Sequence, residues 1–229
     1  MCAQDELQET SQQLLKTTLK RFCIIVVFGV AFAYIEAAVV VYLRTIIYGE
    51  PSILPFPLTE FLTLSLFLTE VGREAATLVL MLTASWLFGR NLQQRFAFFL
   101  TIFTVWDIFY YVWLKVLADW PSSIMDWDIL FLIPVAWAGP VLAPLIVSVT
   151  LLTFAVIILY RSCCAKPIRP TRAGWLAFIV AALIVVASFC VAGLHIAEPD
   201  FQSHFYWPLF APGYILAVAI FLKCLLKSK

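Results

Sequence analysis

The chain has 229 residues, of which 63% are hydrophobic and 13% charged, and its 15 Lys and Arg stand against 14 Asp and Glu. Soluble domains carry about 45–50% apolar and about 25% charged residues, so this composition predicts a membrane protein. At about 20 apolar residues per crossing, the length leaves no room for an added soluble catalytic domain. The near-zero net charge, with no basic run, argues against nucleic acid as a partner.

Six apolar segments are long enough to cross a bilayer once each, and Pro or Gly residues separate them. We expect one transmembrane domain over residues 1–229, an all-α bundle of six transmembrane helices. The predicted spans are 22–43, 62–88, 96–117, 141–160, 173–194 and 209–226. Residues 1–21 are largely polar and are expected to form a cytoplasmic lead before the first span.

Basic residues near span ends indicate the orientation of the bundle, because Lys and Arg favour the cytoplasmic side. If the N-terminus is inside, only Arg44 and Lys115 lie at the outer face and Arg73 lies within a span. All other Lys and Arg then fall on the cytoplasmic side, whereas the outer loops carry mainly acids. Five or seven spans would scramble this partition, so we expect six spans with both termini cytoplasmic.

The segment between the third and fourth spans predicts a short additional helix. Ser123 and Asp126 have the spacing of a capping box, and a helix from this point would continue through Leu132 and end at Pro134. Such a helix is too short to cross the membrane. We expect it to lie along the outer interface or to form a re-entrant element shielded by protein.

Ionisable residues inside the spans are the main functional signal. Each costs about 2.5–3.5 kcal/mol at the bilayer centre unless it faces protein or water. Five such residues lie at a similar depth in the outer half of the first three spans: Glu36, Glu70, Arg73, Glu74 and Asp107. The cost of desolvation predicts that these spans are neighbours and that the five side chains converge to hydrogen-bonding or single-water distance.

Four acids would oppose one Arg in this layer. The three charged residues of the second span share one helical face, and two tyrosines lie one turn beyond the acid of the third span. Either some carboxyl groups hold a proton, or the site holds a cation or a cationic ligand group. The predicted binding residues are Glu36, Glu70, Arg73, Glu74, Asp107, Tyr110 and Tyr111.

A purely structural interpretation is also open, in which Arg73 neutralises one acid as an interhelical ion pair that fixes the bundle. The last three spans hold no Asp, Glu, His, Lys or Arg in their interiors, so the charges are confined to one half of the chain. This asymmetry favours a functional site. It argues against an inverted-repeat transporter, whose two halves should match.

The cysteines and histidines do not follow a metal-binding pattern. The six cysteines have neither C-x-x-C nor zinc-type spacing and are interpreted as free thiols. His195 and His204 flank the last outer loop without zinc or haem spacing and are interpreted as solvated interfacial residues. No nucleotide, hydrolase or metal motif is present, so we predict no metal site and no cofactor.

Six stretches carry a resemblance to known proteins. They are EAAVVVYLR (36–44), VGREAAT (71–77), WDIFYYVWLK (106–115) with Trp120-Pro121 after it, DILFLIP (128–134), GPVLAP (139–144) and WPLF (207–210). Together they resemble a family of bacterial integral membrane proteins to which no activity is assigned. The resemblance implies a multi-pass protein of the bacterial inner, or cytoplasmic, membrane and transfers no mechanism.

Three functions follow from these patterns. The excess of acid favours binding or transport of a proton, a cation or a cationic small molecule at a site open to the periplasm. An alternative is an intramembrane enzyme acting on a lipid or isoprenoid at the outer leaflet, with Asp107 or Glu74 as general acid or base. A third is an accessory subunit that pairs with a membrane-complex partner. The partners expected are membrane lipids, with a small cation or a lipid as ligand.

A cavity would separate these functions. If it reached the charges it would favour the first two, and if it continued to the cytoplasmic side it would favour transport over catalysis.

Overall fold

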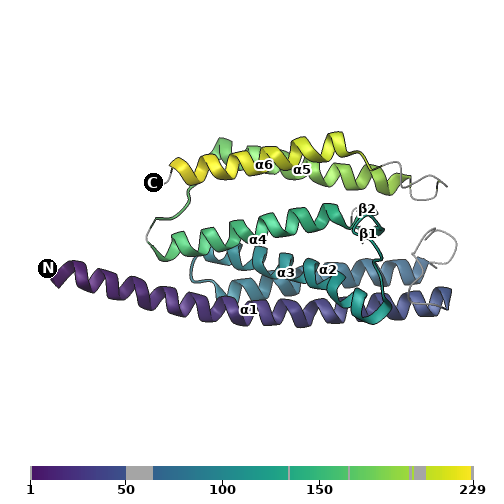
Figure 1. Cartoon of the computed structure of the whole chain (residues 1–229), viewed down its shortest axis with the longest axis horizontal. Helices are drawn as coiled ribbons and strands as arrows, with labels where there is room; N and C mark the ends of the chain where they lie inside the picture. The colour runs from purple at the N-terminus through teal and green to yellow at the C-terminus, as the bar shows by residue number, and fades with distance from the viewer. Residues whose placement is uncertain are drawn as a thin grey trace.

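The structure is a computed structural model that describes residues 2–49, 64–133, 135–164, 166–195, 198 and 205–227, with side chains from residue 12 onward except Tyr48. Its helices are α1 (Cys2–Tyr48), α2 (Leu64–Phe88), α3 (Leu92–Ala118), α4 (Leu142–Cys163), α5 (Arg172–Leu194) and α6 (Trp207–Lys227) (Figure 1). All six are long and apolar enough to cross a membrane. The predicted six-span, all-α membrane bundle is therefore confirmed.

The helix ends differ from the predicted spans where local chemistry extends a helix beyond its apolar stretch. The polar lead is helical and continuous with the first span, since residues 2–28 contain no Gly or Pro and are rich in good helix formers. Helix α3 begins at Leu92, before the predicted start at residue 96. Asn91 caps it there, because its side chain accepts a hydrogen bond from the Gln94 N–H at 2.9 Å.

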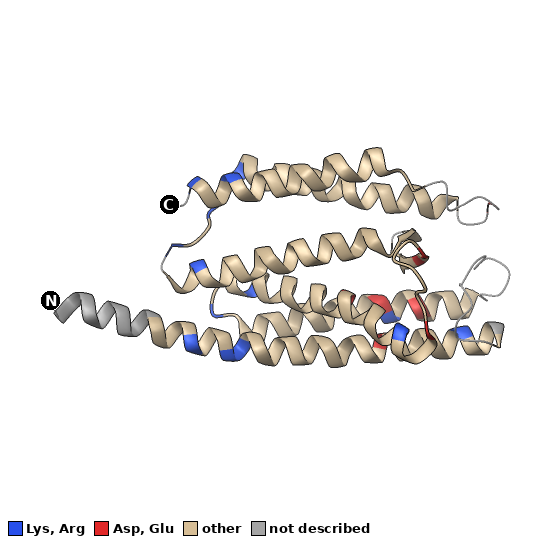
Figure 2. Ribbon diagram, viewed as in Figure 1, with Lys and Arg blue, Asp and Glu red and all other residues tan. Residues whose placement is uncertain are grey.

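Both ends of the chain lie at the same end of the bundle, which we call the N/C end (Figure 1). Figure 2 shows that most of the described Lys and Arg residues lie toward this end, whereas the described Asp and Glu residues lie toward the opposite end. The positive-inside rule expects this distribution if the N/C end faces the cytoplasm.

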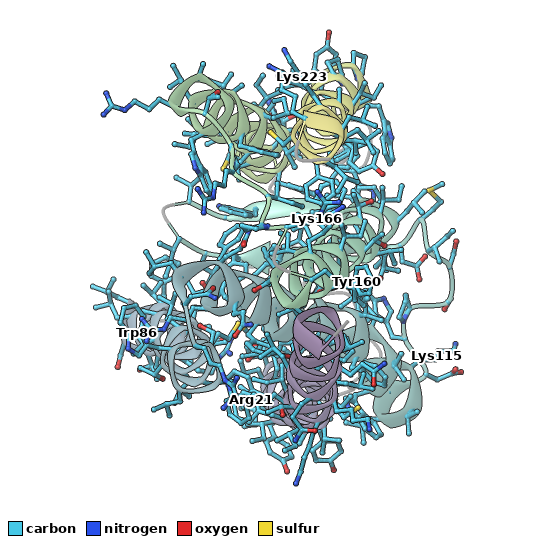
Figure 3. The ribbon with its side chains drawn as sticks, turned by 90° about the vertical axis from the view of Figure 1, so that its left-hand side faces the viewer. Arg21, Trp86, Lys115, Tyr160, Lys166 and Lys223 are labelled. Atoms are coloured by element: carbon cyan, nitrogen blue, oxygen red, sulfur yellow. The ribbon has the colours of Figure 1, made fainter. Side chains whose placement is uncertain are left out.

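Helix α3 is the centre of a four-helix group formed by α1 to α4. It packs against α1, α2 and α4, and its Ala97, Phe98 and Ile102 are fully buried. Helices α5 and α6 pack on each other as a separate pair. In the view from the N/C end, this pair lies at the top, on the side of α4 that is opposite to α1 (Figure 3).

The α5–α6 pair joins the four-helix group at a few specific points in the described part of the chain. Phe154 of α4 stacks on Phe221 of α6 with ring centroids 3.7 Å apart, and the Thr150 and Tyr214 hydroxyls are hydrogen-bonded at 2.8 Å. Toward the N/C end, Trp175 of α5 also packs on Phe96 of α3, with ring centroids 6.0 Å apart.

The prediction of a short helix between the third and fourth spans is wrong. This segment forms an antiparallel β-hairpin of β1 (Trp127–Phe131) and β2 (Trp137–Pro140). The Ser123 and Asp126 side chains do accept hydrogen bonds from backbone N–H groups, but these bonds close a tight turn that leads into the strand. The residues that follow are aromatic and branched aliphatic, which favour a strand when a partner strand is available.

The hairpin lies at the end of the bundle opposite the termini, which we call the hairpin end, between α5 and the four-helix group (Figure 1). Trp137 of β2 stacks parallel to Phe189 of α5 with centroids 6.5 Å apart. Gly193 of α5 approaches the hairpin loop so closely that a Cβ atom there would lie 1.8 Å from the Ala136 carbonyl oxygen. The hairpin thus spaces α5 from α3 at this end.

Candidate intramembrane binding site

A cavity of about 1470 Å³ lies between the α5–α6 pair and the four-helix group. Ligand pockets are typically about 300–1,000 Å³, so this one exceeds the usual size for a small molecule. Its wall is mainly apolar and receives residues from all six helices and from the hairpin. Apart from Arg169 near the N/C end, the charged residues in the wall are Glu36, Arg44, Glu70, Arg73, Glu74, Asp107 and Asp128.

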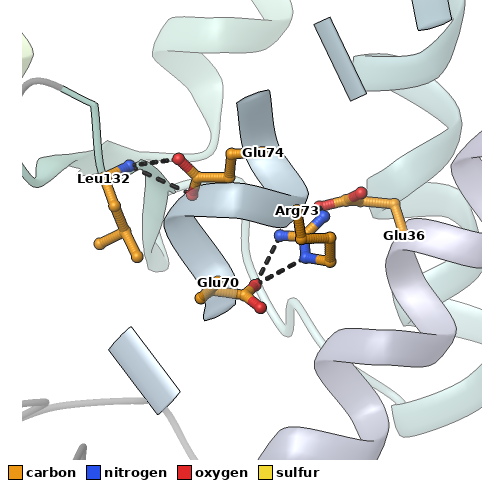
Figure 4. A network of polar contacts seen from close by, with 5 residues as sticks. All are labelled: Glu36, Glu70, Arg73, Glu74 and Leu132. Carbon is orange, nitrogen blue, oxygen red and sulfur yellow. Dashed lines mark hydrogen bonds and ion pairs between the residues drawn. The ribbon is translucent and has the colours of Figure 1, made fainter. Parts of the chain in front are cut away.

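Arg73 joins α2 to α1 through two carboxylates (Figure 4). Its Nε and Nη2 donate to Glu70 Oε1 at 2.9 and 2.5 Å, and its Nη1 donates to Glu36. The Glu70 side chain is 14% exposed and that of Glu36 is 11% exposed. The three groups together carry one more negative than positive charge if all are ionised.

Glu74 is turned away from this network and holds the hairpin. Both of its carboxylate oxygens accept from the backbone N–H of Leu132, at 2.9 and 3.1 Å (Figure 4). Leu132 directly follows β1. Glu74, predicted as a general acid or base, therefore connects α2 to the end of β1 through hydrogen bonds.

Asp107 of α3 bonds toward α4. Its Oδ2 accepts a hydrogen bond from the Ser148 hydroxyl at 2.7 Å. Among the described side chains, the five predicted groups therefore share one cavity wall, but direct ion pairing is limited to Arg73, Glu36 and Glu70.

Arg44 and Asp128 form a second charged pair that the sequence did not indicate. Arg44 was expected as an outer-face charge, but its side chain and that of Asp128 are each only 2% exposed, and Nη2 lies 3.4 Å from Oδ1. The Arg44 guanidinium also lies 4.3 Å over the Trp120 ring. Arg44 follows Glu36 by eight residues, close to two helical turns, and this spacing is the one sequence signal that could have placed it on the same side of the helix.

The predicted binding residues Tyr110 and Tyr111 lie in the cavity wall near Asp128. Burial raises the pKa of Asp128 to about 6, although Arg44 and the two tyrosine hydroxyls act in the opposite direction. The Tyr111 hydroxyl and Asp128 Oδ2 nevertheless make no hydrogen bond of ordinary geometry with the described residues.

Several buried polar atoms around this pair have no hydrogen-bond partner among the described residues. Those that belong to the cavity wall are Arg44 Nε and Nη1, Tyr111 Oη, Trp106 Nε1, Trp137 Nε1 and Asp128 Oδ2. Buried polar groups are normally paired, and each one left unsatisfied costs about 1–3 kcal/mol. The hairpin end of the cavity thus has hydrogen-bonding capacity available for a bound molecule.

The cavity wall also extends to the N/C end. It includes Gln93, whose side-chain N–H donates to the Ile168 carbonyl at 2.7 Å, and Trp175, which packs edge-to-face on Phe96. From Leu92 to Tyr111 the wall follows α3 for about 28 Å at 1.5 Å per residue. That length is close to the thickness of a bilayer core.

The cysteines and histidines add no metal site in the part of the chain that is described. The five cysteines with described side chains form no disulfide, and Cys2 has no described side chain. His195 Nδ1 lies 2.8 Å from Glu198 Oε1, both partly exposed, whereas His204 lies outside the described residues. No group of three or more His, Cys, Asp and Glu side chains in this part could hold a metal ion.

Comparisons of the chain with protein-family models, with curated proteins and with solved structures gave no match. The cavity and the charges in its wall are therefore the basis for a proposal about function.

Proposed function

We propose that this multi-pass membrane protein binds an amphipathic molecule with a positively charged head. The head would lie among the charged residues of the hairpin end and the apolar chain between α3 and α5. The observation that supports this is one large, mainly apolar cavity in whose wall five carboxyl groups and two Arg gather at one end.

The charge at this end favours a cation. If all groups were ionised, five acids and two Arg would leave three negative charges uncompensated in a region of low dielectric constant. A bound cation would lower that cost, because charges interact more strongly there than in water. Of the acids, Asp107 is the best placed to receive it, since the group that donates a hydrogen bond to it is the neutral Ser148 hydroxyl.

The apolar wall favours a ligand with a hydrocarbon chain over a bare ion. Such a chain exchanges lipid surroundings for a protein wall of similar polarity, so it enters at little cost. The head group then determines which amphiphile is selected.

Transport of the bound molecule is the second candidate. The cavity wall extends from Arg44 at the hairpin end to Arg169 and Cys224 at the N/C end. A cavity that reaches both ends favours movement along it over chemistry at one point. We further propose that the N/C end faces the cytoplasm of a bacterial inner membrane, which places the charged residues on the periplasmic side.

Binding of two matched amphiphiles tests the proposal. Native mass spectrometry of the detergent-solubilised protein would compare a long-chain alkylammonium with the alkyl alcohol of the same chain. We expect the alkylammonium to bind several-fold more tightly, and Asp107→Asn to remove this preference because the amide keeps the shape and loses the charge.

Asp119→Asn is the matched control. Asp119 caps α3 outside the cavity, and its side chain is 92% exposed. This variant should bind as the wild type does. Equal affinity of the wild type for the two amphiphiles would contradict the proposal.

A further inference from the structure

The hairpin end of the cavity holds two kinds of polar surface. One consists of carboxyl groups, among them Asp107 and the Glu36–Arg73–Glu70 network. The other consists of hydrogen-bond donors without a described partner: Arg44 Nε and Nη1, Trp106 Nε1, Trp137 Nε1 and the Tyr111 hydroxyl. All belong to residues that are at least nine-tenths buried or line the same cavity wall.

A cationic head alone does not satisfy the donor surface. An ammonium group brings only donors, so it can pair with the carboxyl groups but not with Arg44 or the indole N–H groups. The unpartnered donors need acceptor oxygens. A ligand with an oxygen-rich group beside its positive charge would satisfy both surfaces.

Arg44 indicates that this group is an anion. Asp128 Oδ1 lies 3.4 Å from Arg44 Nη2, and the Arg44 side chain is only 2% exposed. Arg44 Nε and Nη1 have no partner among the described residues, so they remain available to a ligand. Hydrogen bonds from Arg to an oxyanion are about twice as strong as those between neutral groups, and Arg suits phosphate in particular.

Asp128 is compatible with an anion nearby. Burial raises its pKa to about 6. A small further rise on anion binding would leave the carboxyl group protonated, and its O–H would then act as one more donor.

We propose that the ligand is a phospholipid that carries both a phosphate and an ammonium group, an inference that rests on the proposed function. The phosphate and ester oxygens would accept hydrogen bonds from Arg44, Tyr111 and the two indoles. The ammonium would lie against the carboxyl groups that include Asp107. The acyl chains would follow α3 along the apolar wall toward the N/C end.

Three probes with equal chains test the two charges of the head separately. They are phosphatidylethanolamine, phosphatidylglycerol and a long-chain alkylammonium, each titrated against the solubilised protein by native mass spectrometry. We expect phosphatidylethanolamine to bind at least tenfold more tightly than either of the others, because only it carries both charges. An alkylammonium that binds as tightly as phosphatidylethanolamine would overturn the inference.

Tyr111→Phe tests the donor surface without breaking an ion pair, since it removes only a hydroxyl, which lies near Asp128 but makes no hydrogen bond of ordinary geometry with the described residues. We expect about a fivefold loss of phosphatidylethanolamine affinity, the worth of one hydrogen bond, and unchanged alkylammonium affinity. Tyr160→Phe is the control, because Tyr160 of α4 is 56% exposed and lies outside the cavity wall.

The outcomes separate the two proposals. If the wild type binds neither the alkylammonium nor phosphatidylethanolamine, the proposed function fails together with this inference. If it binds the alkylammonium, but phosphatidylethanolamine no better, only the phosphate site is refuted. The same conclusion follows if Tyr111→Phe leaves phosphatidylethanolamine affinity unchanged or lowers the affinity for both probes equally.

Discussion

Arg44 of α1 and Asp128 of β1 form a buried ion pair, and each side chain is only 2% exposed. The backbone N–H of Leu132, the residue directly after this strand, donates to Glu74 of α2. The hairpin is therefore attached to two helices by charged side chains, and on its other side it packs against α5. The width of the cavity at this end depends on these attachments.

The buried pair predicts a difference between single and double substitutions. Arg44→Gln alone should lower the free energy of unfolding above pH 7 by up to about 3–5 kcal/mol, because Asp128 must then either remain an uncompensated buried charge or take up a proton. Arg44→Met combined with Asp128→Leu should recover most of this loss, since no charge then remains to be solvated. Thermal unfolding in detergent measures both, and a double variant no more stable than the single one would argue against a buried pair.

Arg73 predicts a graded series. Arg73→Ala should lower the free energy of unfolding by up to about 3 kcal/mol, somewhat less than for a fully buried ion because the side chain is 23% exposed. Arg73→Lys should restore only part of the loss, because a single ammonium lacks the fork that contacts Glu36 and Glu70 together.

The control for this series is Lys115→Ala. It breaks the exposed pair of Lys115 with Asp119 and should cost less than about 1 kcal/mol. Equal losses for Arg73→Ala and Lys115→Ala in thermal melts would show that the Arg73 network adds nothing beyond a surface pair.

Asp128 predicts that stability rises as the pH falls. Its pKa of about 6 in the folded protein lies above the ordinary value of 3.8, so the folded state binds this proton more readily than the unfolded state. The contribution of Asp128 to the free energy of unfolding is therefore fully present below about pH 4, and it is lost as the pH rises through 6. The change is about 1–3 kcal/mol across this window.

Melting temperatures at pH 7 and pH 5 check the sign. Because other acids also titrate, the informative quantity is the difference in slope between the wild type and Asp128→Asn. The wild type should gain more stability on acidification than the variant. Parallel slopes would mean that Asp128 does not titrate in this range.

The contact of α5 with the hairpin predicts the effect of a single methyl group. Gly193→Ala would place a Cβ atom 1.8 Å from the Ala136 carbonyl oxygen, so the helix or the hairpin must move. We expect a loss of about 1–3 kcal/mol in the free energy of unfolding. Gly72→Ala is the matched control, since its Cβ would have open space and Ala favours the helix by up to about 1 kcal/mol. Equal melting temperatures for the two variants would refute the close contact.

The membrane spans could be predicted because the length of an apolar segment is a local property. The fifth predicted span, 173–194, differs from α5 (Arg172–Leu194) by one residue. The contact between Glu70 and Arg73 could also be predicted, because it depends only on the period of one helix. That these charges face the protein interior followed from the cost of exposing them to lipid.

The partners of the other charges were decided by the tertiary structure. Asp107 bonds Ser148 because α4 packs beside α3, and no local pattern indicates which helix is its neighbour. The hairpin likewise depends on residues distant in the sequence: Trp127 pairs with Pro140, and the Leu132 N–H donates to Glu74 of α2. Apolar length and helical period are encoded along the chain, whereas the partner of a buried polar group depends on how whole helices rotate and pack against one another.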